Sequence, residues 1–149
     1  MSVSYNLFTS AFLAKVTEYD FVSLSETSSN QIIDGYMERA ISSFKKNCKY
    51  DLITTSDSQN RVFNVDIADE DIDELVDIIS EGMLVQWMKP YLYKQENLES
   101  VLNTKDFSTY SPAELLMRIG NAYAKVQKDY TNMIKEYSYN HGDISELHL

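Results

Sequence analysis

Apolar residues recur every three or four positions in four stretches of the chain, which is the spacing of a helix with one buried face. The four stretches cover residues 4–16, 28–49, 69–90 and 112–137. The pattern therefore predicts an all-α protein, a small helical bundle of about four main helices with a long C-terminal helix. The expected core positions of the last two helices are Ile72, Leu75, Ile79, Met83, Trp87, Ile119, Tyr123, Val126 and Tyr130.

The third stretch joins an acidic start to a strongly apolar second half that ends at Trp87 and Pro90. Because apolar residues surround that second half, we expect it to be buried on more than one side. Gly82 lies in the helix interior, where glycine costs about 1 kcal/mol relative to alanine. This cost predicts that another helix approaches closely at Gly82. Pro90 is expected to end the helix.

The remaining segments complete a single domain that covers residues 1–149. Residues 1–27 are expected to form an N-terminal arm with a short helix, whose apolar face either packs on the core or docks on a neighbouring subunit. Residues 54–66 are loop-like, and this loop could hold a short strand at Arg61–Val65 or a hairpin. Ser111, Pro112 and Glu114 have the spacing of a capped helix start. Residues 139–149 form a C-terminal tail.

Acidic residues are concentrated just before and within the third stretch. The formal net charge is −10, and residues 51–82 contain ten acids but only one base. Anions are favoured at a helix start, but carboxylates three and four residues apart repel one another, so the helix dipole explains only part of the block. Neither Asp57 nor Asp66 begins an EF-hand calcium loop, because no glycine stands at the sixth position. The candidate surface acids are Asp69, Glu70, Asp71, Asp73, Glu74 and Asp77.

The chain lacks the motifs of common catalytic and metal sites. Its two histidines, His141 and His148, are near the C-terminus, and it has no paired cysteines, phosphate-binding glycine loop or nucleophile elbow. We therefore expect no enzyme activity, no metal and no cofactor. No apolar run approaches 18 residues, and the N-terminus lacks the features of a signal peptide, so no membrane segment is expected.

Cys48 is the only cysteine, which favours a reducing compartment. It continues the apolar stripe of the second stretch, which is typical of a buried thiol rather than a nucleophile. Lys45, Lys46 and Lys49 are expected in the last turns of that helix, where a solvated end matched to the helix dipole is favoured over a nucleic-acid site. The eleven tyrosines either cover the edges of the core or belong to protein interfaces.

Several segments together resemble a known family. They are FKKNCKYDL at the end of the second helix, then NRVFN, then MLVQWMKP from Met83 to Pro90, NTKDFSTYS from Asn103 to Ser111, and YSYNHGD near the C-terminus. Over roughly residues 30–145 this order resembles small structural proteins of bacteriophages with long non-contractile tails. The W-M-K-P and K-D-F-x-x-Y-S elements are its most specific parts.

The resemblance implies a head–tail connector, or adaptor, a structural virion protein in the neck. Such a protein assembles in the host cytoplasm into a ring, commonly of twelve subunits, under the portal protein. The ring extends the DNA channel, through which DNA passes without specific binding, and is a platform for the stopper or tail-completion protein. The candidate acids would face the channel, and the expected partner-docking tail comprises Tyr139, Asp143, Ile144, Leu147 and Leu149.

An alternative function follows from the charge alone. An acidic intracellular binding module, such as a DNA mimic that inhibits a host protein, would use the same acids to capture a basic partner.

Overall fold

Four helices and a small sheet make up the part of the chain that the structure describes. A computed structural model describes residues 2–17, 30–93 and 112–141, and it confirms the predicted small helical bundle. The helices are α1 (Asn6–Val16), α2 (Asn30–Phe44), α3 (Asp69–Tyr93) and α5 (Pro112–His141). The strands are β1 (Val3–Ser4), β2 (Ser56–Asp57) and β3 (Val62–Phe63).

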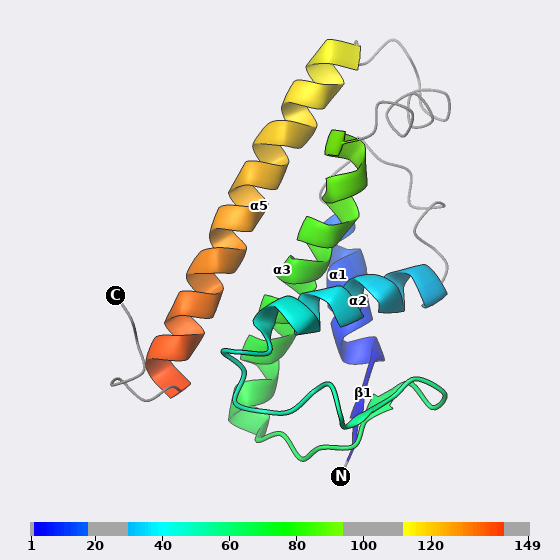
Figure 1. Cartoon of the computed structure of the whole chain (residues 1–149), viewed down its shortest axis with the longest axis vertical. Helices are drawn as coiled ribbons and strands as arrows, with labels where there is room; N and C mark the ends of the chain where they lie inside the picture. Colours follow the sequence, from blue (N-terminus) through cyan, green and yellow to red (C-terminus); the bar gives the residue numbers. More distant parts are fainter. Residues whose placement is uncertain (1, 18–29, 94–111, 142–149) are drawn as a thin grey trace.

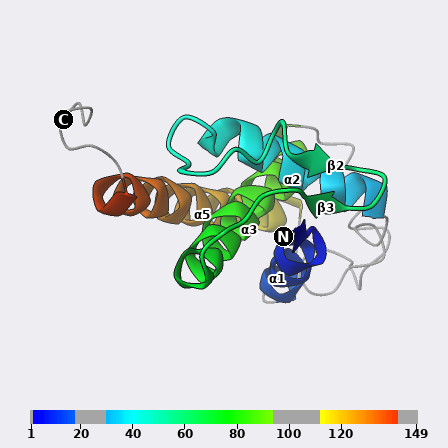
Figure 2. The same ribbon diagram turned by 90° about the horizontal axis from the view of Figure 1, so that it is seen from below.

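Helix α3 is the centre of the fold and packs against α1, α2 and α5. Figure 1 shows α2 crossing α3 on one side while α5 runs along it on another, and Figure 2 shows α1 and α2 on different sides of α3. The third predicted helix is therefore buried on more than one side, as expected. Ile78 to Val85 are all buried, and so are Trp87 and Met88.

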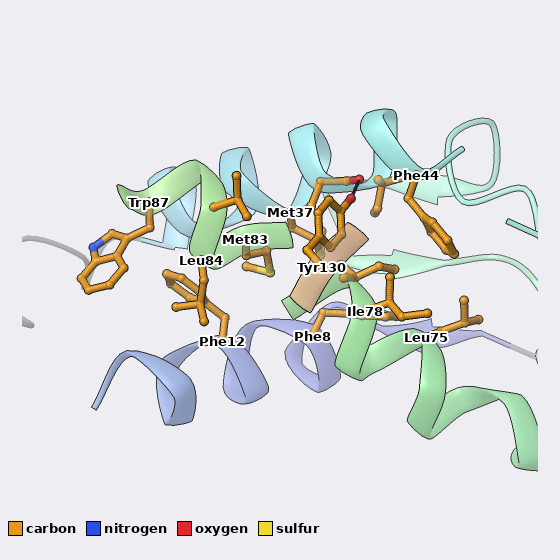
Figure 3. Close-up of a cluster of buried hydrophobic side chains, with 14 of the residues drawn as sticks. Phe8, Phe12, Met37, Phe44, Leu75, Ile78, Met83, Leu84, Trp87 and Tyr130 are labelled. Carbon is orange, nitrogen blue, oxygen red and sulfur yellow. Dashed lines mark hydrogen bonds between the residues drawn. The ribbon is translucent and has the colours of Figure 1, made fainter. Parts of the chain in front are cut away.

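Gly82 lies where three helices meet. A Cβ atom built on Gly82 would lie 2.9 Å from the Cβ atom of Ala40 on α2 and 2.9 Å from ring carbons of Tyr130 on α5. The predicted close approach is confirmed, and it involves two helices rather than one. Tyr130 is held there by its hydroxyl, which lies 2.6 Å from the Ser43 hydroxyl (Figure 3).

The N-terminal segment belongs to the core. Phe8, Phe12 and Val16 of α1 are fully buried, and the Phe12 and Trp87 rings meet edge to face at 6.3 Å. Figure 3 shows Phe8 and Phe12 pointing from α1 toward α3 side chains. Of the two interpretations of this segment, packing on the core is therefore the correct one for α1.

The sheet joins β1, at the N-terminus, to β2 and β3, which lie more than 50 residues later in the sequence. Its order is β1-β3-β2, with both pairings antiparallel, and Val3 and Ser56 both face Phe63 in the register. The hairpin expected within residues 54–66 is confirmed, because β2 and β3 pair antiparallel there, and the short strand expected at Arg61–Val65 is β3. Phe63 packs on Phe8 edge to face at 5.5 Å, so the sheet covers one end of α1.

Three expected helix ends differ from the structure. Helix α2 ends at Phe44, where the amide of Asn47 donates to the Phe44 carbonyl in a turn, so the three lysines follow the helix instead of completing it. Helix α3 continues to Tyr93 with Pro90 inside it, and the missing amide and crowded ring of the proline are tolerated because they fall in the last turn of the helix. Helix α5 begins at Pro112 as predicted and continues one turn beyond residue 137, to His141; Ser111 lies outside the described residues.

Seven of the nine predicted core positions are buried. Ile72 and Tyr123 are half-buried instead, because each lies at the edge of its helix's buried face. The buried set also includes Phe44 and Tyr137, which lie on the apolar stripes of the second and last helices, and Phe63 of the sheet.

Candidate functional site

The acidic start of α3 is the first candidate site. The amides of Asp71 and Ile72 donate to the carbonyl of Ala68, so the helix begins without a side-chain cap at residue 68. Asp69 and Glu70 lie in the first turn, where unpaired backbone amides favour negative charge. Asp69, Glu70 and Asp73 are exposed, and within the described part of the chain none of them has an ion-pair partner.

Asp71 does not belong to this exposed group, so its expected place among the surface acids is wrong. Only 4% of it is exposed, and its carboxylate accepts a 2.6 Å hydrogen bond from the Tyr50 hydroxyl. The Lys49 ammonium lies 3.7 Å from the same oxygen. The hydrogen bond to Asp71 is the main reason that the pKa of Tyr50 is raised. Asp71 therefore ties the start of α3 to the chain after α2.

Asp77 remains accessible but is already paired. The Lys15 ammonium on α1 lies 2.8 Å from a carboxylate oxygen of Asp77 and 2.8 Å from one of Glu81. The Glu81 side chain is only 11% exposed, so this ion pair is partly shielded from water. Lys15 therefore connects α1 to α3, and Asp77 and Glu81 serve the fold. Glu74, another candidate, is half-buried.

Three acids are left as a surface feature: Asp69, Glu70 and Asp73, which we call the acidic strip. At about 100° per residue these positions span roughly 100° of the helix circumference. Leu75 and Ile78, which are buried, point to the opposite side of α3. The strip faces solvent and lies away from the core.

The end of α5 is the second candidate site. Tyr139 is 69% exposed there, while Asp143, Ile144, Leu147 and Leu149 lie outside the described residues. The last turns of α5 are attached to the loop after α2. The Lys49 amide donates to the Tyr137 hydroxyl at 3.1 Å, and the Ser138 hydroxyl donates to the Asn47 side-chain oxygen at 3.1 Å. Burial raises the pKa of the Tyr137 hydroxyl.

A cluster around Arg61 was not found from the sequence. The Arg61 guanidinium donates to both carboxylate oxygens of Asp34 at 2.8 and 2.9 Å, and to the Asn6 side chain at 2.9 Å. The hydrogen bond to Asp34 raises the pKa of Arg61. Arg61 has a positive φ of 54° in the β2–β3 turn. Arg61 therefore joins the sheet to Asn6 of α1 and Asp34 of α2. In the sequence, only its position as the single base among residues 51–82 indicated that it was unusual.

The comparisons with known proteins found no match: no family model, curated protein or solved structure is similar to this chain. None of the helices in the described ranges is long and apolar enough to span a membrane. Among the same residues, no cluster of three or more metal-ligating side chains is present.

Proposed function

We propose that this chain is a head–tail connector of a long-tailed bacteriophage. It forms a ring under the portal protein, lets DNA pass through the ring without specific binding, and presents a platform for a stopper or tail-completion protein in the neck of the virion. The proposal starts from the resemblance of the Met83–Pro90 and Asn103–Ser111 segments. The single structural observation that supports it most is the acidic strip.

The acidic strip has a cost for the fold that a function would explain. Like charges three and four residues apart destabilise a helix by a few tenths of a kcal/mol each. The other acids of α3 have partners or are buried, as with Asp71, Asp77 and Glu81. A channel lined with carboxylates repels the phosphates of passing DNA, whereas lysines or arginines would retain them. A strip that faces the channel would therefore let DNA pass without binding.

Exposed apolar side chains at the two ends of α5 are consistent with ring assembly. Met117 is 62% exposed near the start of the helix, and Tyr139 is 69% exposed near its end. Over 22 residues the rise between them is about 33 Å. A ring subunit needs two different faces for head-to-tail contacts, and these two positions provide separate apolar sites.

The test begins with the mass of the purified protein, alone and with the portal protein encoded by the same genome. Analytical ultracentrifugation is expected to show a ring with the portal, and the protein should sediment with virions. A protein that stays a monomer with the portal and is absent from virions would refute the connector function.

The role of the acidic strip has its own test. Asp69→Lys/Asp73→Lys should leave ring assembly intact but slow DNA release from the virion, because lysines attract the phosphates. Glu38→Lys/Glu136→Lys is the matched control, since both glutamates are exposed on other helices and the change in charge is equal. Equal DNA release rates for the two variants would refute the proposal that the acidic strip faces the channel. A structure of the ring in which the strip points away from the channel would refute it as well.

The acidic strip also supports the alternative, an acidic module that captures a basic host protein in place of DNA. Such a protein is absent from purified virions and competes with DNA for its target. The virion sedimentation experiment therefore separates the two functions.

A further inference from the structure

A pocket of about 420 Å³ lies between the C-terminal half of α2 and the loop that follows it. Ile41, Phe44, Leu52 and Ile53 provide its apolar walls, and Lys45 and Lys49 add two exposed ammonium groups. A water molecule occupies about 30 Å³ of liquid, so the space accepts side chains rather than a single water. Ile53 is 43% exposed, so a large apolar side chain here is open to solvent.

The end of α5 is hydrogen-bonded to the loop that lines this pocket. Ser138 and Tyr137 are hydrogen-bonded to Asn47 and Lys49, the residues on either side of the pocket residue Cys48. The chain therefore leaves α5 at His141 close to the pocket. The eight residues that follow, 142–149, lie outside the described residues and reach at most about 29 Å when extended. The pocket is well within that reach.

The composition of residues 142–149 matches the pocket. Ile144, Leu147 and Leu149 supply apolar side chains, and Asp143 and Glu146 supply two carboxylates. The pocket offers apolar walls and the ammonium group of Lys45 in a chain of net charge −10, while Lys49 faces Asp71. Its one acid, Asp51, is satisfied locally, because its carboxylate accepts hydrogen bonds from the Ile53 and Thr54 amides at 3.0 Å and from the Thr54 hydroxyl.

We propose that the pocket between α2 and residues 45–54 is the docking site of the chain's own C-terminal segment, residues 142–149. The apolar side chains of the segment fill the pocket, and Glu146 pairs with Lys45, whereas the Lys49 ammonium already faces the Asp71 carboxylate at 3.7 Å. The proposal does not depend on the connector function. It adds an intramolecular contact that a partner protein would have to displace before the segment could bind elsewhere.

Cys48 provides a direct reporter, because it lines the pocket and is the only cysteine of the chain. The experiment measures its rate of reaction with N-ethylmaleimide, a small neutral reagent, in the full-length protein by mass spectrometry. Ile144→Ser/Leu147→Ser keeps every charge and is expected to raise the rate about tenfold, equivalent to about 1.4 kcal/mol of lost docking free energy. A synthetic peptide of residues 142–149 should slow the reaction again.

Charge reversal tests the contact with Lys45. Glu146→Lys should also raise the Cys48 rate, and Lys45→Glu combined with Glu146→Lys should restore it. Glu136→Lys is the matched control, because it is an exposed glutamate of α5 that does not line the pocket. Circular dichroism of each variant confirms that the helices remain folded.

Three results decide the proposal. Protection of Cys48 that depends on residues 142–149 and is unchanged by dilution supports intramolecular docking. Protection that is lost on dilution assigns the pocket to the segment of a second copy and overturns the intramolecular form. A Cys48 rate that is the same in the wild type, Ile144→Ser/Leu147→Ser and Glu146→Lys overturns docking of this segment altogether.

Discussion

Gly82→Ala tests the packing at the centre of the fold. In an exposed helix interior this change stabilises by about 1 kcal/mol, because alanine has the better helix propensity and restricts the unfolded chain. At Gly82 the new methyl group would lie 2.9 Å from the Ala40 Cβ atom and 2.9 Å from the Tyr130 ring. Favourable carbon–carbon contacts begin near 3.5 Å, so α3 has to separate from both α2 and the Tyr130 ring by about 0.6 Å or more.

The expected magnitude follows from three contributions. Overpacking a core typically costs about 1–3 kcal/mol. Displacing Tyr130 also weakens its 2.6 Å hydrogen bond to Ser43, a loss of about 1 kcal/mol. Against the propensity gain of about 1 kcal/mol, Gly82→Ala should lower the free energy of unfolding by about 1–3 kcal/mol.

Gly35→Ala is the matched control. Gly35 also lies inside a helix, α2, but an added Cβ atom there meets nothing within 4 Å. This variant should raise the free energy of unfolding by up to about 1 kcal/mol. Urea denaturation followed by Trp87 fluorescence and by circular dichroism measures both variants. A Gly82→Ala protein that is stabilised as much as Gly35→Ala would refute the close packing of the three helices.

Three further predictions concern the contacts that join the helices. Lys15→Met should lower the free energy of unfolding by about 2–3 kcal/mol, because it leaves the shielded Glu81 carboxylate without its cation. Asp77→Asn should lower it by less than about 1 kcal/mol, because Asp77 is exposed. Equal losses for the two variants in urea denaturation would contradict this assignment. Tyr130→Phe should lower the free energy of unfolding by about 1 kcal/mol, and adding Ser43→Ala should lower it little further, because the two hydroxyls share one hydrogen bond. A double-mutant cycle measures this coupling. Folding raises the pKa of the Tyr137 hydroxyl, so the contribution of Tyr137 to the free energy of unfolding is fully present below the unfolded pKa near 10. The free energy of unfolding should fall as the pH rises above that value. The fall should be shallower in Tyr137→Phe, and an unchanged pH profile in that variant would exclude Tyr137 as its source.

The candidate site was only partly predictable from local sequence. Acids at the start of a helix were expected to be exposed as one group, yet Asp71 and Asp73, two residues apart, have opposite environments. Their difference depends on Tyr50, which lies 21 residues before Asp71 and donates a hydrogen bond from its hydroxyl to the Asp71 carboxylate. No local pattern at Asp71 indicates that partner. The same holds for Asp77, whose partner Lys15 is 62 residues away.

The spacing of apolar residues was sufficient to predict the four helices. A helix forms from contacts between residues three and four apart, and the same spacing determines which residues lie on its buried face. Gly82 was recognisable for a related reason, since glycine inside an apolar helix has a cost that only close packing offsets. Strand β1 was not predictable, because it has two residues and exists through pairing with β3, whereas β2 and β3 form a hairpin within the loop where a short strand or hairpin was expected. Local spacing thus determined the helices and most of their buried faces. The tertiary structure decided which acids remain at the surface, because that choice depends on partners brought together from distant parts of the chain.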